Sequence, residues 1–277
     1  MVKVSAYVIA YNEEEKIRDC VQTLLWADEI IVADSGSTDR TAAWAEELGA
    51  NVVQVPFNGF GDLRNQAIVH CTGDWVFSLD ADERCTSAVR DEILEIIHRP
   101  ESERADIYQV PRRNFFLGRW IKHAGWYPNY RQPQLFRRGS MSYDLKPVHE
   151  GYIAHSHKPI GELTAAIWQI PFKNLDEVMH KANRYSTLGV DKLVERGKQG
   201  SFAKALLHGF WSFFKHYLLK RGFLDGWPGF IIALGNFEGT FYRHAKLTER
   251  QASWSLPKSE QVLKKISHGY FGCPYDL

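Results

Sequence analysis

Residues 75–83 read WVFSLDADE: a short apolar run passes directly into three carboxylates. The run has the length and the unbroken apolar character of a strand that is covered on both faces, as in a parallel sheet flanked by helices. Asp80 and Asp82 follow at its carboxyl end, which is the edge where open α/β sheets bind ligands. The stretch therefore predicts an α/β fold and a ligand site at the end of this strand.

The chain before this stretch alternates strands with segments of helical period. Strands are expected at residues 3–10, 29–33 and 51–55. Asn12 is placed to cap the helix after the first strand, and Ser37 or Thr38 the helix after the second. Alternation of this kind is typical of a mostly parallel central sheet flanked by helices.

The composition narrows the function classes. Lys and Arg total 34 against 33 Asp and Glu, so the formal charge of +1 argues against a protein that binds nucleic acid through bulk electrostatics. The four cysteines share no CxxC or zinc-type spacing, and the N-terminus lacks the order of a signal peptide. No run reaches the ~18 to 20 apolar residues that span a bilayer. We expect a cytoplasmic protein.

The residue types at the strand ends suit a nucleotide and a divalent cation. Two carboxylates at i and i+2 can reach one Mg²⁺ or Mn²⁺ ion, which prefers oxygen ligands and often shares them with phosphates. An isolated DxD also arises by chance, and its ordinary role is a solvated turn with a helix cap. Asn12, Glu13 and Asp34 follow the first two strands, where they can contact a ribose or a base. Arg64 in GFGDLRN can bind a diphosphate through its guanidinium.

Sequence fingerprints of other nucleotide sites do not occur in this chain. No GxGxxG joins the first strand to its helix and there is no GxxxxGK[ST] loop, so NAD binding and P-loop chemistry are disfavoured. Nucleotidyltransferases usually carry a Gly-rich, basic loop after the first strand, where this chain has AYNEEEK. That second enzyme class is therefore disfavoured as well.

Five segments, taken in order, resemble family 2 glycosyltransferases, the inverting enzymes of the GT-A fold: VIAYNEE, IIVADSGSTDRT, GFGDLRNQAI, TGDWVFSLDADE and LFRRGSMSYDLKPVHEG. The resemblance covers about the first 150 residues. KANRYS and KRGFLDGWPGF are similar to the branch that contains lipopolysaccharide core β-glucosyltransferases. The resemblance implies a GT-A (nucleotide-diphospho-sugar transferase) fold with a mostly parallel central sheet flanked by helices.

The pattern weakens after Ile107, and helical spacing resumes near Leu175. No low-complexity linker separates these parts. We expect a catalytic domain at residues 1–185, with a nucleotide-sugar half at 1–106 and an acceptor half at 107–185, followed by a helical, aromatic-rich C-terminal extension at 186–277.

The resemblance also implies a role for each donor-site residue. Asp80 and Asp82 would hold the metal, and Ala81 between them would line the donor site. The nucleoside and diphosphate would be bound by Tyr11, Asn12, Glu13, Asp34 and Arg64. In many members two successive acids follow the second strand, whereas here Asp34 is followed by Ser35. A UDP-sugar is favoured as the donor, although this departure leaves the preference for uracil open.

By resemblance, Glu150 in KPVHEG is the base that takes the proton of the acceptor hydroxyl. Asp144 and His149 are rivals for this role. From the residues alone, the same segment is interpreted as an ordinary edge strand with solvent-exposed side chains. Glu150 is therefore a candidate that depends on the family pattern.

The acceptor site is expected around the same segment. Arg131 and Arg137 can bind a phosphorylated or carboxylated acceptor, since a guanidinium can hold such an anion through two hydrogen bonds. Trp126 offers a flat face to a sugar ring, and His149 lies next to the candidate base. The alternatives are a solvated basic rim for the arginines and a structural role for the ring.

Apolar side chains recur at three- and four-residue steps from Phe202 to Tyr217, with Lys and Arg nearby. A helix with such a face can lie in a membrane interface, and residues 202–237 are expected to contact the inner-membrane surface. Packing on the catalytic domain or on a second subunit is the alternative. The sequence therefore leaves monomer and homo-oligomer open.

Together these observations predict an inverting, metal-dependent hexosyltransferase. It would move a hexose, with glucose expected, from a nucleotide diphosphate sugar to a cell-envelope glycolipid such as lipopolysaccharide core. We expect it on the cytoplasmic face of the inner membrane. The alternatives are a glycosyltransferase for another lipid-linked or polysaccharide acceptor, and a noncatalytic carbohydrate-binding or membrane scaffold protein.

Overall fold

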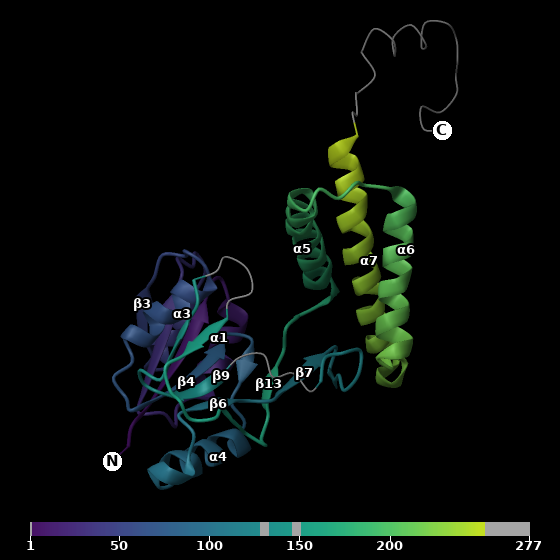
Figure 1. Cartoon of the computed structure of the whole chain (residues 1–277). Coiled ribbons are helices and arrows are strands. Elements are labelled where there is room, and N and C mark those ends of the chain that lie inside the picture. The colour runs from purple at the N-terminus through teal and green to yellow at the C-terminus, as the bar shows by residue number, and fades with distance from the viewer. Residues whose placement is uncertain (1, 128–132, 146–150, 253–277) are drawn as a thin grey trace, which may run out of the picture. The chain divides into compact units, whose positions relative to one another are not determined.

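The computed structural model describes residues 2–127, 133–145 and 151–252 of the chain (Figure 1). Its packing divides into two compact units. The first unit comprises the chain up to Glu177 together with Lys215–Ala233, and the second comprises Val178–Phe214 with the chain from Leu234 onward. The predicted domain boundary at residue 185 lies inside helix α5 (Leu175–Glu195) and stays a prediction.

A seven-stranded sheet forms the centre of the first unit, in the order β12-β6-β9-β4-β1-β2-β3. Its strands are β1 Val4–Ala10, β2 Glu29–Asp34, β3 Asn51–Gln54, β4 Trp75–Asp80, β6 Ile107–Gln109, β9 Pro133–Arg137 and β12 Gly161–Glu162. β1 to β4 are parallel to one another, whereas β9 is antiparallel to both β4 and β6. The four strands predicted from the sequence are confirmed, and the sheet is mostly parallel as expected.

Helices cover both faces of this sheet: α1 Glu14–Gln22, α2 Thr41–Glu47, α3 Phe60–Val69 and α4 Ser87–His98. All seven residues of β1 are buried, and they alternate between two apolar clusters. Ala6 and Val8 join the cluster that contains residues of α1, α2 and α4, while Tyr7 and Ile9 join the one that contains residues of α3. Because both faces are occupied by helices, ligands are left with the ends of the strands.

After Asp82 the chain enters a second sheet, which has four strands in the order β5-β13-β7-β8. These strands are β5 Glu83–Arg84, β7 Arg112–Phe116, β8 Arg119–Trp120 and β13 Ile167–Gln169. Only Ala81 and Asp82 separate β4 from β5, so the acids lie where the chain passes from one sheet to the other. Two further strands, β10 Met141–Tyr143 and β11 Tyr152–Ala154, form an antiparallel pair, and Glu101–Glu103 form a 3-10 turn, η1.

Residues 215–233 pack with the first unit. They comprise a π-helical turn, η2 Lys215–Leu219, a 3-10 turn, η3 Gly222–Asp225, and the start of helix α7 (Gly226–Gln251). The buried carboxylate of Asp225 accepts hydrogen bonds from the backbone N–H groups of Lys122 (3.1 Å) and His123 (2.8 Å). The carbonyl of Lys220 accepts another from Ala124 N at 2.9 Å. These bonds hold the segment against the loop after β8.

The second unit consists of most of α5, helix α6 (Phe202–Phe214) and the longer part of α7, which lie side by side (Figure 1). Gly209 of α6 faces α7, where atoms of Phe237 and Phe241 lie 3.0 and 3.3 Å from the place of an added Cβ. α6 therefore packs through its small residues. Among the helices in the described part of the chain, none combines the length and the apolar character needed to cross a membrane.

Candidate active site

The candidate site lies at the carboxyl ends of β1, β2 and β4. Asp80 is the last residue of β4 and Asp34 the last of β2, and both strands are neighbours of β1. In the register of the sheet, Ile9 pairs with Asp80 and Ala10 pairs with Asp34. The two acids thus flank the end of β1 at nearly the same level.

Asp82 is a partly buried carboxylate in the turn after β4. Its two oxygens accept hydrogen bonds from Gln169 Nε2 at 3.2 and 3.1 Å. Burial, and then the negative charge of Asp80, raise the pKa of Asp82 to about 6. The protein's own positive charges therefore do not fully offset the negative charge at this place.

Glu83, the third acid of the stretch, is fully buried. Its carboxylate lies 2.6 Å from Arg112 Nη2, and it accepts hydrogen bonds from Gln134 Nε2 (3.0 Å) and from Asp80 N (2.9 Å). Burial raises the pKa of Glu83 to about 7, and Arg112 opposes this rise. Glu83 is thus held by an ion pair and hydrogen bonds to its neighbours, and it fixes the backbone at Asp80. The sequence pattern contains this acid but does not reveal its burial.

Oxygens of Asp80, Asp82 and Glu83 all lie within 4.8 Å of one another. Three carboxylates this close repel each other, and two of them have a raised pKa. A hard divalent cation prefers oxygen ligands and would offset the excess negative charge. The donor set therefore fits Mg²⁺ or Mn²⁺.

Arg64 is buried on α3, where its Nη2 atom lies 2.6 Å from Asp80 Oδ1. Burial disfavours the charged form of this guanidinium, but Asp80, Tyr143 and Tyr7 together outweigh that effect, and the pKa of Arg64 is raised well above its ordinary value. The Arg64 guanidinium also lies 5.5 Å from the ring centre of Tyr143. The structure therefore joins two predicted donor-site residues, Arg64 and Asp80, in one ion pair, while contact of Arg64 with a diphosphate stays a prediction.

The loops after β1 and β2 are tied together by predicted donor-site residues. Asn12 has a φ of +52°, and its side-chain oxygen accepts a hydrogen bond from Thr38 N at 2.8 Å. The buried Asp34 accepts hydrogen bonds from Ser37 N at 3.1 Å and from Gln54 Nε2 at 2.9 Å. These side chains shape the loops, and the predicted caps at Asn12 and at Ser37 or Thr38 are wrong, because α1 and α2 begin later, at Glu14 and Thr41.

A model of glycosyl transferase family 2 matches residues 5–154, which include all of these acids. The chain belongs to glycosyl transferase family 2. A curated relative, the lipopolysaccharide core biosynthesis glycosyltransferase LpsC of Rhizobium meliloti (strain 1021), is 31% identical, and the match covers 94% of this chain and 97% of that protein. The predicted family and the GT-A fold class are confirmed.

Two solved structures are similar to this family 2 glycosyltransferase. Glucosyl-3-phosphoglycerate synthase from Mycobacterium tuberculosis, in complex with Mn²⁺, UDP and glucosyl-3-phosphoglycerate, is 27% identical; the match covers 40% of this chain and 44% of that chain, with a TM-score of 0.36. TarS 1-349 of S. aureus is 16% identical; that match covers 92% of this chain and 93% of that chain, with a TM-score of 0.47.

Tyr11 and Glu13 complete the loop after β1 in this glycosyltransferase. The Tyr11 side chain is exposed, whereas the Glu13 carboxylate lies 3.2 Å from Lys16 Nζ. Lys16 also lies 3.2 Å from the carboxylate of Glu177. The structure therefore leaves the ring of Tyr11 accessible at this edge of the sheet.

Three of the predicted catalytic and acceptor-site residues, Glu150, His149 and Arg131, lie outside the described residues. Trp126 is described, and its carbonyl accepts a hydrogen bond from Asn114 Nδ2 at 2.9 Å. Asn114 pairs in register with Gln169, the residue that donates to Asp82. Trp126 thus lies in the loop after β8 and is tied to β7 of the second sheet, beside the residue that holds Asp82.

Arg137 is not brought to the acidic edge. It is the last residue of β9 and pairs in register with Trp75, the first residue of β4. Because β9 is antiparallel to β4, Arg137 lies at the amino end of β4 and Asp80 at its carboxyl end. Arg137 was predicted for the acceptor site from the sequence motif, which carries no information on the direction of β9; that role stays a prediction.

Proposed function

We propose that this glycosyltransferase transfers a hexose, with glucose as the first candidate, from a UDP-sugar to a lipopolysaccharide core glycolipid. The similarity to LpsC over nearly the whole of both chains supports the acceptor class. The carboxylate pair at the end of β4, Asp80 and Asp82, is the observation that carries the proposal.

Asp80 and Asp82 would hold the metal in this proposal. A bound Mg²⁺ or Mn²⁺ would supply positive charge for the diphosphate leaving group. Asp82 is the better ligand of the two, because its hydrogen bonds come from a neutral amide and leave oxygen lone pairs available. Asp80 is oriented by Arg64 on one side and by the Glu83 bond to its backbone on the other.

The nucleoside would lie on the loops after β1 and β2. Asn12 and Asp34 fix the shape of these loops, and the exposed ring of Tyr11 can stack on a base. Many family members have two successive acids after the second strand, whereas this chain has Asp34 followed by Ser35. A single buried carboxylate, that of Asp34, would therefore take the place of the acid pair beside the base. A UDP-sugar remains our first candidate on the strength of the family.

For the chemical step, we propose Glu150 as the base that takes the proton of the acceptor hydroxyl. A single in-line displacement by that hydroxyl then inverts the anomeric carbon, and the nucleotide diphosphate leaves with the bonding electrons. Trp126 is our candidate for the acceptor side, because its carbonyl is bonded to Asn114, the register partner of the residue that donates to Asp82. Asp144, whose backbone N donates to Gly151 O at 3.0 Å, is the second candidate for the base.

The protein would act at the cytoplasmic face of the inner membrane. On α6 several large apolar residues are exposed, with Leu207 at 70%, Phe210 at 61% and Trp211 at 56%, while Ala205 and Gly209 are buried. The only acid in residues 196–237 is the buried Asp225, and the cations there are Arg196, Lys198, Lys204, Lys215, Lys220 and Arg221. An apolar face in a basic stretch suits an anionic lipid surface.

Calorimetric titration of a nucleotide-sugar panel, with and without Mn²⁺, tests the donor site. We expect wild-type protein and the exposed-acid control Asp91→Asn to bind UDP-glucose in a Mn²⁺-dependent way, and Asp82→Asn to lose that binding because a charged ligand is gone. Binding that is equal in all three proteins would remove Asp82 from the metal site. Failure of the wild type to bind any donor would favour the noncatalytic scaffold.

Glu150→Gln tests the base separately from donor binding. We expect this variant to bind UDP-glucose like the wild type and to lose transfer to a lipopolysaccharide core acceptor, because the amide cannot accept the proton. Transfer near the wild-type rate would move the role to Asp144. Turnover only on another lipid-linked or polysaccharide acceptor would replace the proposed acceptor.

A further inference from the structure

The loop after β8 carries a histidine that is held by a buried carboxylate. The Nδ1 atom of His123 lies 3.1 Å from Oδ1 of Asp225, whose side chain is 2% exposed. The other oxygen of this carboxylate accepts a hydrogen bond from the backbone N–H of His123 at 2.8 Å. Asp225 therefore fixes both the backbone and the ring of His123.

This pairing decides which nitrogen of the neutral ring carries the proton. The carboxylate of Asp225 accepts hydrogen bonds, so the ring nitrogen that faces it, Nδ1, is the donor. The second nitrogen, Nε2, then has a free lone pair. Among the described residues none is hydrogen-bonded to Nε2 of His123, and 32% of the side chain is exposed. Nε2 can therefore accept a hydrogen bond from a ligand.

The same loop returns to the face of the second sheet where Asp82 lies. Asn114 and Gln169 pair in register on neighbouring strands, about 4.8 Å apart, so their side chains point to the same face. Gln169 donates to the carboxylate of Asp82, and Asn114 donates to the carbonyl of Trp126. His123 precedes Trp126 by three residues, so it belongs to the segment that lies over this face.

The backbone of the loop is strained where it follows His123. Ala124 has a φ of +55°, which is uncommon for a residue with a Cβ, and Gly125 has a φ of +81°. Ala124 N donates to the carbonyl of Lys220 at 2.9 Å, and a Cβ at Gly125 would collide with the Lys220 side chain. Such strain persists only where the surroundings enforce it, and it is concentrated at ligand sites.

We propose that His123 binds the acceptor sugar, with Nε2 accepting a hydrogen bond from a sugar hydroxyl and Asp225 positioning the ring. This role rests on the acceptor proposed above, because it names a residue for the acceptor side of the same site. An oriented acceptor atom of this kind discriminates against a sugar that lacks the hydroxyl. Asp225 lies beyond residue 154, where the match to the family model ends, so the C-terminal part of the chain would contribute to acceptor choice.

Calorimetry with a truncated core oligosaccharide tests the proposal without a donor. The probe is released by mild acid from lipopolysaccharide of cells that lack this protein, so that it ends in the acceptor sugar. Two variants of His123 separate binding from loop structure. His123→Asn keeps an N–H at the place of Nδ1 for Asp225 but has no acceptor at the place of Nε2, whereas His123→Gln places an amide oxygen near Nε2 and gives up the bond to Asp225.

We expect His123→Asn to weaken oligosaccharide binding about tenfold and His123→Gln to stay within about threefold of the wild type, because only the second variant can accept from the hydroxyl. A merely structural histidine predicts the reverse order, and that order would overturn the proposal. Equal binding by the wild type and His123→Asn would overturn it as well.

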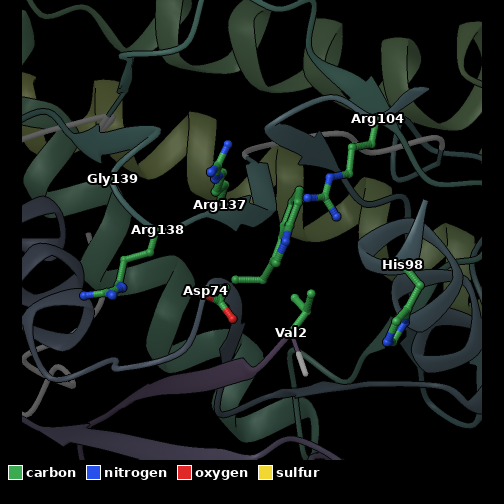
Figure 2. A pocket seen from close by; sticks show the side chains of 8 residues that line it. Val2, Asp74, His98, Arg104, Arg137, Arg138 and Gly139 are labelled. Atoms are coloured by element: carbon green, nitrogen blue, oxygen red, sulfur yellow. The ribbon is translucent and has the colours of Figure 1, made fainter. Parts of the chain in front are cut away.

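His98 provides the matched control. Its Nδ1 atom is also engaged, with the carbonyl of Leu94 at 2.6 Å. It lines a cavity with Asp74 and Trp75 at the start of β4, the end of the strand opposite Asp80 (Figure 2). His98→Asn should therefore bind the oligosaccharide like the wild type, and a loss equal to that of His123→Asn would overturn the proposal.

Ring ¹⁵N chemical shifts test the positioning role of Asp225. We expect His123 to show the single Nδ1–H form in the wild type and a mixture of both forms in Asp225→Asn, together with weaker oligosaccharide binding. A mixture in the wild type, or no change in Asp225→Asn, would contradict that role.

Titration with UDP-glucose and Mn²⁺ reads the donor site separately, and both His123 variants should bind this donor like the wild type. If the wild type binds UDP-glucose but not the oligosaccharide, the proposed acceptor fails and His123 loses its role with it. If the wild type binds the oligosaccharide but no nucleotide sugar, the proposed donor fails while the order of the His123 variants still decides this inference.

Discussion

Replacing Arg112 by Met should destabilise the protein strongly, because it leaves the buried carboxylate of Glu83 without its cation. The two groups lie 2.6 Å apart and both are buried. At an effective dielectric constant of about 20, charges at that distance attract by about 6 kcal/mol, and breaking a buried pair from one side usually destabilises a protein by about 3–5 kcal/mol. Burial already raises the pKa of Glu83 to about 7, so the carboxyl can take up a proton in the variant. We therefore expect a loss of unfolding free energy at the lower end of this range, about 3 kcal/mol.

Thermal unfolding measures this effect. A loss of about 3 kcal/mol should lower the Tm by about 6–12 °C in a protein of this size. Arg113→Met is the matched control on the same strand: its exposed guanidinium lies 4.5 Å from the ring centre of Trp120, a contact that contributes about 0.5–1 kcal/mol. The double variant Glu83→Gln with Arg112→Met should recover part of the loss, since no charge is then left buried. If Arg112→Met unfolds within about 2 °C of Arg113→Met, the reasoning about this pair is refuted.

Two further predictions concern the site and the packing. Gln169→Leu removes the donor to Asp82, and we expect the Mn²⁺ concentration for half-maximal donor binding to rise about 10- to 100-fold; an unchanged value would show that this bond does not orient the carboxylate. Gly229→Ala would place a Cβ against the carbonyl of Gly222 and should lower the Tm, whereas Gly239→Ala, with open space around it in the same helix, should raise stability by up to about 1 kcal/mol. Equal Tm changes in these two variants would contradict the packing described for α7.

The sequence predicts the strands and the acidic edge well, because these follow from local patterns. An apolar run that changes to charge at Asp80 marks both the end of a strand and its exit from the core. The structure shows a local cap of this kind at Thr86, whose side chain accepts a hydrogen bond from Val89 N at 3.2 Å. The four predicted strands, each contained in one segment, agree with the structure.

The parts that could not be predicted depend on partners far apart in the chain. Glu83 looks like one more surface acid until Arg112 of β7 is brought against it. Asn12 looks like a helix cap until Thr38 of the next loop is seen to bind it. The position of Arg137 at the amino end of β4 could not be predicted either, because the motif gives no strand direction. Each of these outcomes was decided by tertiary contacts.

For the C-terminal helices, too, the sequence predicts only part of the structure. The spacing of apolar residues in α6 predicts a helix, and this is confirmed. Spacing cannot tell which face of such a helix is covered. In the structure the side of Ala205 and Gly209 packs, because small residues allow α7 to approach closely, and Phe210 and Trp211 remain exposed.

Strand β9 contributes a side chain to each of the two edges of the central sheet where the strands end. Its residue Gln134 reaches Glu83 beside the acids, while Arg137, three positions later, pairs with Trp75 at the other edge. Side chains alternate along a strand, so a slip of β9 by a single position would turn each of these side chains to the opposite face. The alignment of Arg137 with Trp75 therefore fixes both edges at once, and amide exchange at the four residues of β9 after Pro133 would report the integrity of both together.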